Sequence, residues 1–211
     1  MLAFHALWDL EHFGVLPTGT METPFADVVR CVGGGSFILI SGMLVLSSRE
    51  PVRRGFFLFC IGLAVAIVTA LAGVPVRFGI LQLLGICMML CGAFREKLKR
   101  VRSVGFGAVC LALFAAAWLL TARTEVSFPW LYPLGFRSAD FRSADYWPLL
   151  PWTFLYLLGT QLGALLERGV AGKRRYPRAL TFPGRHSLVI YLVHQPILYG
   201  LCLLVFSGKN L

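Results

Sequence analysis

An apolar segment near the C-terminus runs to Phe206. It begins with the stretch Gly184-Arg185-His186-Ser187-Leu188-Val189-Ile190-Tyr191-Leu192-Val193-His194-Gln195-Pro196-Ile197. At about 1.5 Å of rise per residue, a helix over His186–Phe206 is long enough to cross about 30 Å of hydrocarbon. His194 and Gln195 lie inside this span, and polar groups at that depth cost free energy unless they face a partner, a cavity or a substrate. The stretch therefore predicts a membrane helix that carries a functional site. Hydrogen bonding that only ties helices together is the alternative.

The composition of the whole chain also indicates a membrane protein. Of its 211 residues, 57% are hydrophobic and 14% are charged, and the mean hydropathy is +0.74, which is not typical of a soluble domain. Six apolar runs have the length of a membrane span: Phe25–Ser48, Gly55–Gly73, Val76–Phe94, Val104–Ala122, Trp147–Leu166 and His186–Phe206. Met1–Leu16 is apolar but gives only about 24 Å of helix, so we expect a seventh span that is truncated at its N-terminus. The prediction is an all-α polytopic protein of about seven transmembrane helices, with residues 1–211 forming a single domain.

Basic residues are concentrated in alternate loops. Ser47–Arg54, Arg95–Arg102 and Arg168–Arg185 together hold 14 of the 20 Lys and Arg residues. Because short loops rich in these residues stay in the cytoplasm, we expect the N-terminus inside and the C-terminus outside. This topology explains the net charge of +10 better than a nucleic-acid partner does.

The first apolar segment carries three polar residues on one helix face. His5, Asp9 and His12 are spaced i, i+4 and i+7, which places them in a stripe about 60° wide. A carboxylate one turn from an imidazole can hold its tautomer and raise its basicity. The pattern is typical of a general base acting on an amine or hydroxyl, and a buried polar network without catalytic function is the alternative.

Further polar residues lie in or beside other spans. Gln82 and Arg77 fall in the third apolar run, and Asp145 closes the second copy of a tandem repeat, Phe136–Asp140 followed by Phe141–Asp145. We expect a function for the second copy because it adjoins the next span. The six cysteines show no Cys-x-x-Cys or Cys/His ligand spacing, so no metal site is predicted.

Several segments in this order resemble one known family. They are Phe4-His5, Trp8-Asp9-Leu10, Phe13-Gly14, Phe37-Ile38-Leu39-Ile40-Ser41-Gly42, Arg77-Phe78-Gly79-Ile80-Leu81, Ser143-Ala144-Asp145-Tyr146-Trp147-Pro148-Leu149-Leu150-Pro151-Trp152, Gly184-Arg185-His186-Ser187 and His194-Gln195-Pro196. Together they make nearly the whole chain similar to the membrane domain of the heparan-alpha-glucosaminide N-acetyltransferase family, specifically its short bacterial relatives.

The resemblance implies a membrane-embedded acyltransferase of the bacterial inner membrane. Such an enzyme moves an acetyl group from cytosolic acetyl-CoA to an amine or hydroxyl on the outer side, with an amino sugar as the expected acceptor. The family's lysosomal members use a histidine near the outer part of the first span, and either His5 or His12 fits that position. We place His5 first because it belongs to the Phe4-His5 stretch that resembles the bacterial relatives and has Asp9 one turn away.

The other expected site residues divide by role. His194, Gln195 or Gln82 can donate to the oxyanion that develops during acyl transfer. Acceptor binding is assigned to Arg77, Gln82, Asp145 and Gln195, and binding of the CoA phosphates to Arg53, Arg54 and Arg185. The expected partners are the lipid bilayer, acetyl-CoA and a small-molecule or glycan acceptor, with a homodimer expected from the family alone.

Two other functions remain open at this stage. A small proton-coupled transporter would use the same His and Asp stripe to relay protons or bind a solute, although the two halves show no inverted repeat. A non-catalytic membrane scaffold would use these polar groups only to pair with one another.

Overall fold

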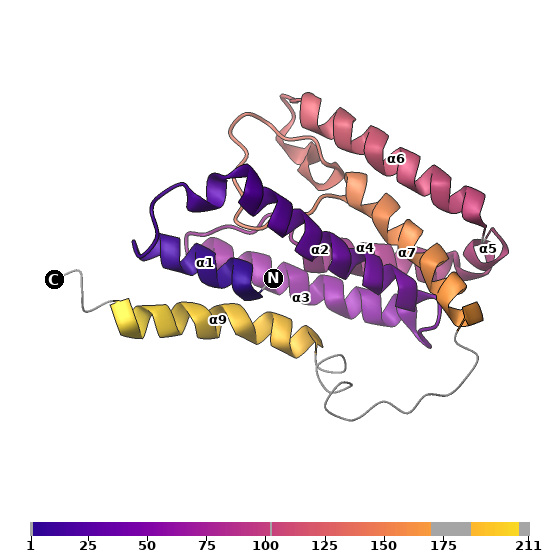
Figure 1. The fold of residues 1–211 in the computed structure, drawn as a ribbon, viewed down its shortest axis with the longest axis horizontal. Helices are drawn as coiled ribbons and strands as arrows, with labels where there is room; N and C mark the ends of the chain where they lie inside the picture. The colour runs from indigo at the N-terminus through magenta and orange to yellow at the C-terminus, as the bar shows by residue number, and fades with distance from the viewer. Residues whose placement is uncertain (1, 102, 170–186, 207–211) are drawn as a thin grey trace. The chain divides into compact units, whose positions relative to one another are not determined.

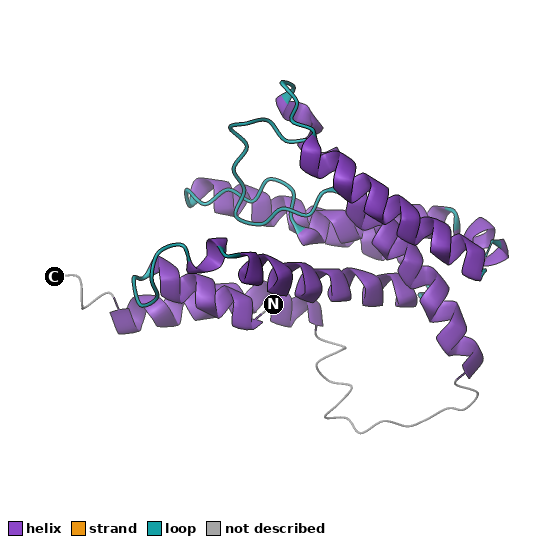
Figure 2. Ribbon diagram, turned by 45° about the horizontal axis from the view of Figure 1, so that its top comes forward, coloured by secondary structure: helices purple, strands orange, loops and turns teal. Residues whose placement is uncertain are grey.

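A computed structural model describes residues 2–101, 103–169 and 187–206 (Figure 1). Within these ranges the chain is helical and contains no strand, as Figure 2 shows. The α-helices are α1 Leu2–His12, α2 Pro24–Val45, α3 Pro51–Leu71, α4 Ile80–Ala93, α5 Arg95–Arg100, α6 Val104–Arg123, α7 Leu149–Gly169 and α9 Ser187–Phe206, and the 3-10 helices are η1 Thr20–Glu22 and η2 Pro129–Leu134. The predicted all-helical class is confirmed.

Within the described residues, four helices are long and apolar enough to cross a membrane: Pro24–Val45, Pro51–Leu71, Val104–Arg123 and Leu188–Phe206. They identify the chain as an integral membrane protein, and the count of about seven spans stays a prediction. The expected span over Val76–Phe94 differs from the helix observed, because α4 begins only at Ile80 and has 14 residues. A helix of that length reaches about 21 Å.

The described chain divides into two compact units. One unit contains residues 1–34 and 172–211, and the other contains Gly35–Ala171. The first therefore holds α1, η1, the start of α2 and α9, and the second holds the rest of α2 with α3 to α7. The assignment of the whole chain to one domain stays a prediction.

In the first unit α1 packs along α9 (Figure 1). The ring of His5 lies against His194, that of His12 near Tyr199, and that of Phe13 near Phe206. Residue numbers increase together along the two helices, so α1 and α9 run parallel.

In the second unit glycines allow helices to approach closely. A Cβ on Gly55 of α3 would lie 2.7 Å from the carbonyl oxygen of Gly85 on α4, and a Cβ on Gly159 of α7 would collide with the carbonyl oxygen of Leu39 on α2. Such small-residue contacts are typical of helix packing inside membranes, where van der Waals contact replaces the hydrophobic effect. They fix α3 against α4 and the second half of α2 against α7.

Candidate functional site

Polar side chains of α1 and α9 meet within the first unit. Gln195 donates through Nε2 to Oδ1 of Asp9 across 3.0 Å, and the rings of His5 and His194 lie 5.1 Å apart between centroids. The ring of His12 lies 6.0 Å from that of Tyr199. His5, Asp9 and His12 thus all face α9, which confirms the shared face that their spacing predicts.

The cluster contains buried polar atoms that make no hydrogen bond to any described residue. They are Oδ2 of Asp9, Nε2 of His194 and Oε1 of Gln195. The side chain of Asp9 is fully buried, and His194 is only 8% exposed. Because buried polar groups in proteins are nearly always paired, these three atoms make the cluster the candidate polar site of the first unit.

The hydrogen bonding of His194 fixes which ring nitrogen is available. Its Nδ1 lies 3.2 Å from the carbonyl oxygen of Ile190, one turn earlier on α9. A carbonyl can only accept, so the neutral ring carries its proton on Nδ1. Nε2 then holds a lone pair and can take a proton from a bound molecule.

The structure gives Asp9 a different partner from the one expected. The sequence suggested that Asp9 orients His5, whereas the hydrogen bond of its carboxylate is to Gln195. His5 instead packs against His194. The carboxylate therefore holds α9 to α1, and the two imidazoles form a pair of their own.

Two other polar residues of α1 have local roles. His12 is exposed, and its ring stacks on Trp8 at 5.3 Å with an interplanar angle of 7°. Glu11 accepts from the backbone N–H groups of Gly19 and Met21 at 2.6 and 2.7 Å. Glu11 thus fixes the turn after α1.

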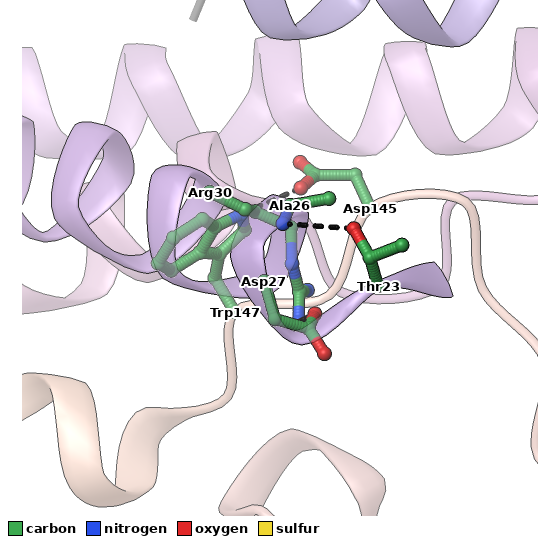
Figure 3. A network of polar contacts seen from close by, with 6 residues as sticks. All are labelled: Thr23, Ala26, Asp27, Arg30, Asp145 and Trp147. Atoms are coloured by element: carbon green, nitrogen blue, oxygen red, sulfur yellow. Dashed lines mark hydrogen bonds and ion pairs between the residues drawn. The ribbon is translucent and has the colours of Figure 1, made fainter. Parts of the chain in front are cut away.

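A second group of expected site residues lies at the N-terminal end of α4. Gln82 accepts through Oε1 from the N–H of Gly79 at 2.6 Å. Asp145 accepts through Oδ2 from the N–H of Ile80 at 3.3 Å and through Oδ1 from Nε1 of Trp147 at 2.5 Å; the close-up in Figure 3 includes the latter pair. Both side chains satisfy donors that the first turn of a helix leaves unpaired.

The second copy of the tandem repeat is tied to the segment before α4. Oγ of Ser143 accepts from the N–H of Arg77 at 3.0 Å, and the N–H of Ala144 donates to the carbonyl of Pro75 at 3.0 Å. The N–H of Trp147 donates to the carbonyl of Phe78 at 2.9 Å. These bonds hold residues 75–79 outside the helix, which explains why α4 begins later than hydropathy alone suggests.

Two arginines lie over aromatic rings in this loop region. The guanidinium carbon of Arg77 is 5.6 Å from the centre of the Phe141 ring, and that of Arg137 is 6.0 Å from the centre of the Tyr146 ring. Burial raises the pKa of Tyr146 to about 12, and the positive charge of Arg137 opposes this shift. Arg77 and Arg137 are exposed, so their charges are available to an anion.

Two of the three basic residues expected to bind CoA, Arg53 and Arg54, lie in the first turn of α3. Arg53 pairs with Glu50 at 3.1 Å, and Nη1 of Arg54 lies 3.5 Å from Oγ of Ser48. Both arginines are exposed. Arg185 lies outside the described residues.

Sequence reasoning missed the aromatic neighbours of the polar clusters. The ring of Tyr191 lies 5.5 Å from that of His194, and its position three residues earlier on the same helix was the available signal. Arg137 was missed because its contact joins the first copy of the repeat to Tyr146, the residue that follows the second copy. In the part of the chain that the structure describes, no group of three or more His, Cys, Asp or Glu residues is placed to hold a metal ion.

Comparison with known proteins gives one match. The model of the heparan-alpha-glucosaminide N-acetyltransferase catalytic family matches residues 1–196. No curated protein and no solved structure matches the chain.

Proposed function

Because the chain belongs to the heparan-alpha-glucosaminide N-acetyltransferase family, a family of membrane acetyltransferases, we propose that it transfers an acetyl group from acetyl-CoA to an amino-sugar acceptor. The observation that carries this proposal is the cluster between α1 and α9. Two imidazoles, a carboxylate and a carboxamide meet there, and three buried polar atoms lack a hydrogen-bond partner among the described residues.

The cluster offers the groups that acyl transfer needs. One imidazole of the His5 and His194 pair takes a proton from the acceptor amine, whose nitrogen attacks the thioester carbonyl. The bond between carbonyl carbon and sulfur then breaks, and the CoA thiolate leaves and takes up a proton. His194 supports this role because Nδ1 is bound to Ile190 and Nε2 is not, and His5 supports it by ring contact with His194.

Residues outside the cluster are proposed to bind the two substrates. Arg53, Arg54 and Arg185 would hold the CoA phosphates through charge-assisted hydrogen bonds. Arg77 is exposed and suited to contact the acceptor. Gln82 and Asp145 are bonded to the first turn of α4, so they would act as positioning residues for that end of the helix.

The parallel packing of α1 and α9 supports the proposed orientation. Parallel helices that both cross the membrane are separated by an odd number of crossings. Seven crossings place five between them, with the N-terminus in the cytoplasm and the C-terminus outside. The basic loops at Ser47–Arg54 and Arg95–Arg102 then face the cytoplasm, where acetyl-CoA is made available, and the membrane would be the bacterial inner membrane.

The test is acetyl transfer by the purified protein in liposomes, with glucosamine as the acceptor and released CoA as the readout. We expect His5→Ala and His194→Ala each to lower turnover by a factor of about 10² to 10⁴, while CoA binding is retained. His12→Ala is the matched comparison on the same helix. A loss confined to His12→Ala would move the base to that residue.

The same preparation separates the enzyme from a transporter. Proton-coupled glucosamine flux without CoA release, or failure to bind CoA, would contradict acetyl transfer. Loss of CoA release in His5→Ala with unchanged thermal unfolding would exclude a purely structural role for the cluster.

A further inference from the structure

The second unit contains a cavity of about 350 Å³ between α4, α5, α6 and α7. Its wall is formed largely by apolar side chains, among them Leu90, Phe94, Leu98, Phe106 and Leu157. The polar cluster between α1 and α9 belongs to the other unit, and none of its residues lines this cavity. The cavity therefore calls for an occupant of its own.

The polar atoms of the wall are few, and two of them pair with each other. Sγ of Cys87 donates to Oγ1 of Thr153 at 3.6 Å. Cys87 and Cys91 are buried at 1% and 3% exposure, and a thiol packs as a small apolar group. The interior of the cavity thus suits a hydrocarbon chain.

Charge is confined to one position of the lining. Lys97 on α5 is the charged residue among those that line the cavity, and its Nζ lies 5.6 Å from the centre of the Phe94 ring. The next basic residue, Lys99, is paired with Glu96 at 3.1 Å. Among the residues the structure describes, no carboxylate pairs with Lys97, so its ammonium group is available to an anion.

The position of α5 next to a membrane helix indicates where Lys97 lies relative to the membrane surface. This short basic helix, Arg95–Arg100, connects the end of α4 to the start of the membrane helix α6. Basic residues directly beside a membrane helix lie at the level of the lipid head groups, where they attract anionic lipids. An acyl chain between α4 and α7 would then place its head group beside Lys97.

We propose that this cavity binds one acyl chain of an anionic phospholipid, with the lipid phosphate held by Lys97. The apolar wall favours binding of the acyl chain, and the ammonium group of Lys97 favours a negatively charged lipid head group. The bound lipid fills the space between α4 and α7 and holds α5 against the bundle. Zwitterionic lipids share the chain but carry a compensating positive charge, so they bind more weakly.

The test uses the full chain, stripped of lipid in detergent and titrated with dioleoylphosphatidylglycerol or dioleoylphosphatidylcholine under native mass spectrometry. Wild type should bind one phosphatidylglycerol with an affinity about fivefold above phosphatidylcholine, the preference expected from one lysine at the membrane surface. Lys97→Gln should abolish that preference. Lys99→Gln on the same helix should retain it, since Lys99 does not line the cavity.

A filled cavity gives a second arm. Cys91→Phe should lower the amount of phosphatidylglycerol bound, and thermal unfolding checks that this variant is folded. The phosphatidylglycerol preference of the wild type and its loss in Lys97→Gln carry the test if it is not.

Several outcomes would overturn the proposal. They are equal affinity of wild type for the two lipids, or equal effects of Lys97→Gln and Lys99→Gln. Preferential binding of free oleic acid over phosphatidylglycerol would also overturn it, because the occupant would then be a fatty acid.

Discussion

Gln195 on α9 donates a hydrogen bond of 3.0 Å to Asp9 on α1, joining two residues that are 186 positions apart in the chain. Asp9 is fully buried, and an unpaired buried carboxylate is costly. The bond therefore fixes α9 against α1 and brings His194 beside His5. The proposed chemistry depends on this arrangement.

Gln195→Leu should destabilise the protein because it removes the hydrogen-bond partner of a buried carboxylate. We expect a loss of about 1–3 kcal/mol in the free energy of unfolding, measured by denaturant titration in detergent. The double variant Asp9→Leu, Gln195→Leu should lose less than the sum of the single variants, since it leaves no polar group unpaired. Unchanged stability of Gln195→Leu would show that the carboxylate has other partners.

His5→Ala and His194→Ala should not be additive in their effects on turnover. The two rings lie 5.1 Å apart. When two residues act as a unit, removal of either one abolishes nearly the whole catalytic contribution of the pair. The double variant should therefore turn over about as slowly as the slower single variant. If the fold-loss of turnover in the double variant equals the product of the two single losses, the imidazoles act in separate steps.

Gly159→Ala should destabilise the second unit. Its added methyl group would collide with the carbonyl oxygen of Leu39, and overpacking of this kind costs about 1–3 kcal/mol. Gly200 of α9 has open space at its Cβ position, so Gly200→Ala should stabilise its helix by about 0.5–1 kcal/mol. The two variants should shift thermal unfolding in opposite directions.

Asp145→Ala should loosen the start of α4. The variant loses the hydrogen bonds to Ile80 and Trp147. If this loss lowers the free energy of local opening by about 1.4 kcal/mol, hydrogen exchange of the Ile80 amide should become about tenfold faster. Asp140, the matching residue of the first repeat copy, is exposed, and Asp140→Ala should leave that amide unchanged. An increase in the KM for the acceptor without faster exchange would instead indicate direct binding by Asp145.

Tyr146 should stay protonated well above the ordinary range of a phenol. Burial raises its pKa to about 12, and its hydroxyl donates to the carbonyl of Tyr132 at 2.7 Å. Because the unfolded chain loses this proton near pH 10, the contribution to stability is complete below about pH 10 and is lost as the pH rises towards 12. Tyrosinate absorbance of wild type minus Tyr146→Phe measures the titration, and a midpoint near 10 would contradict the burial.

The local geometry of α1 was predictable from the chain. Helical periodicity places His5, Asp9 and His12 on one face whatever that face meets, and the structure confirms it through His194, Gln195 and Tyr199. The partner of Asp9 was not predictable, because His5 at one turn and a distant glutamine are both suitable hydrogen-bond partners. Only the packing of α9 on α1 decides between them.

The third apolar run shows the limit of hydropathy. Val76–Phe94 is apolar apart from Arg77 and Gln82, yet only residues from Ile80 onward form α4. The residues before it are not helical because their backbone groups bond to Ser143, Ala144 and Trp147, which follow almost seventy positions later. Hydropathy measures the tendency of residues to be buried in lipid or protein, and it does not distinguish a helix from a non-helical segment.

The sequence by itself determined that this protein is a helical membrane protein, which family it belongs to, and which polar residues share a helix face. Composition, span length and helical periodicity are local properties, so they can be derived from neighbouring residues. The tertiary structure decided that Asp9 pairs with Gln195, that Asp145 caps α4, and that the cavity beside Lys97 exists. These contacts join residues far apart in the chain, and their free energy arises only when packing brings the helices together.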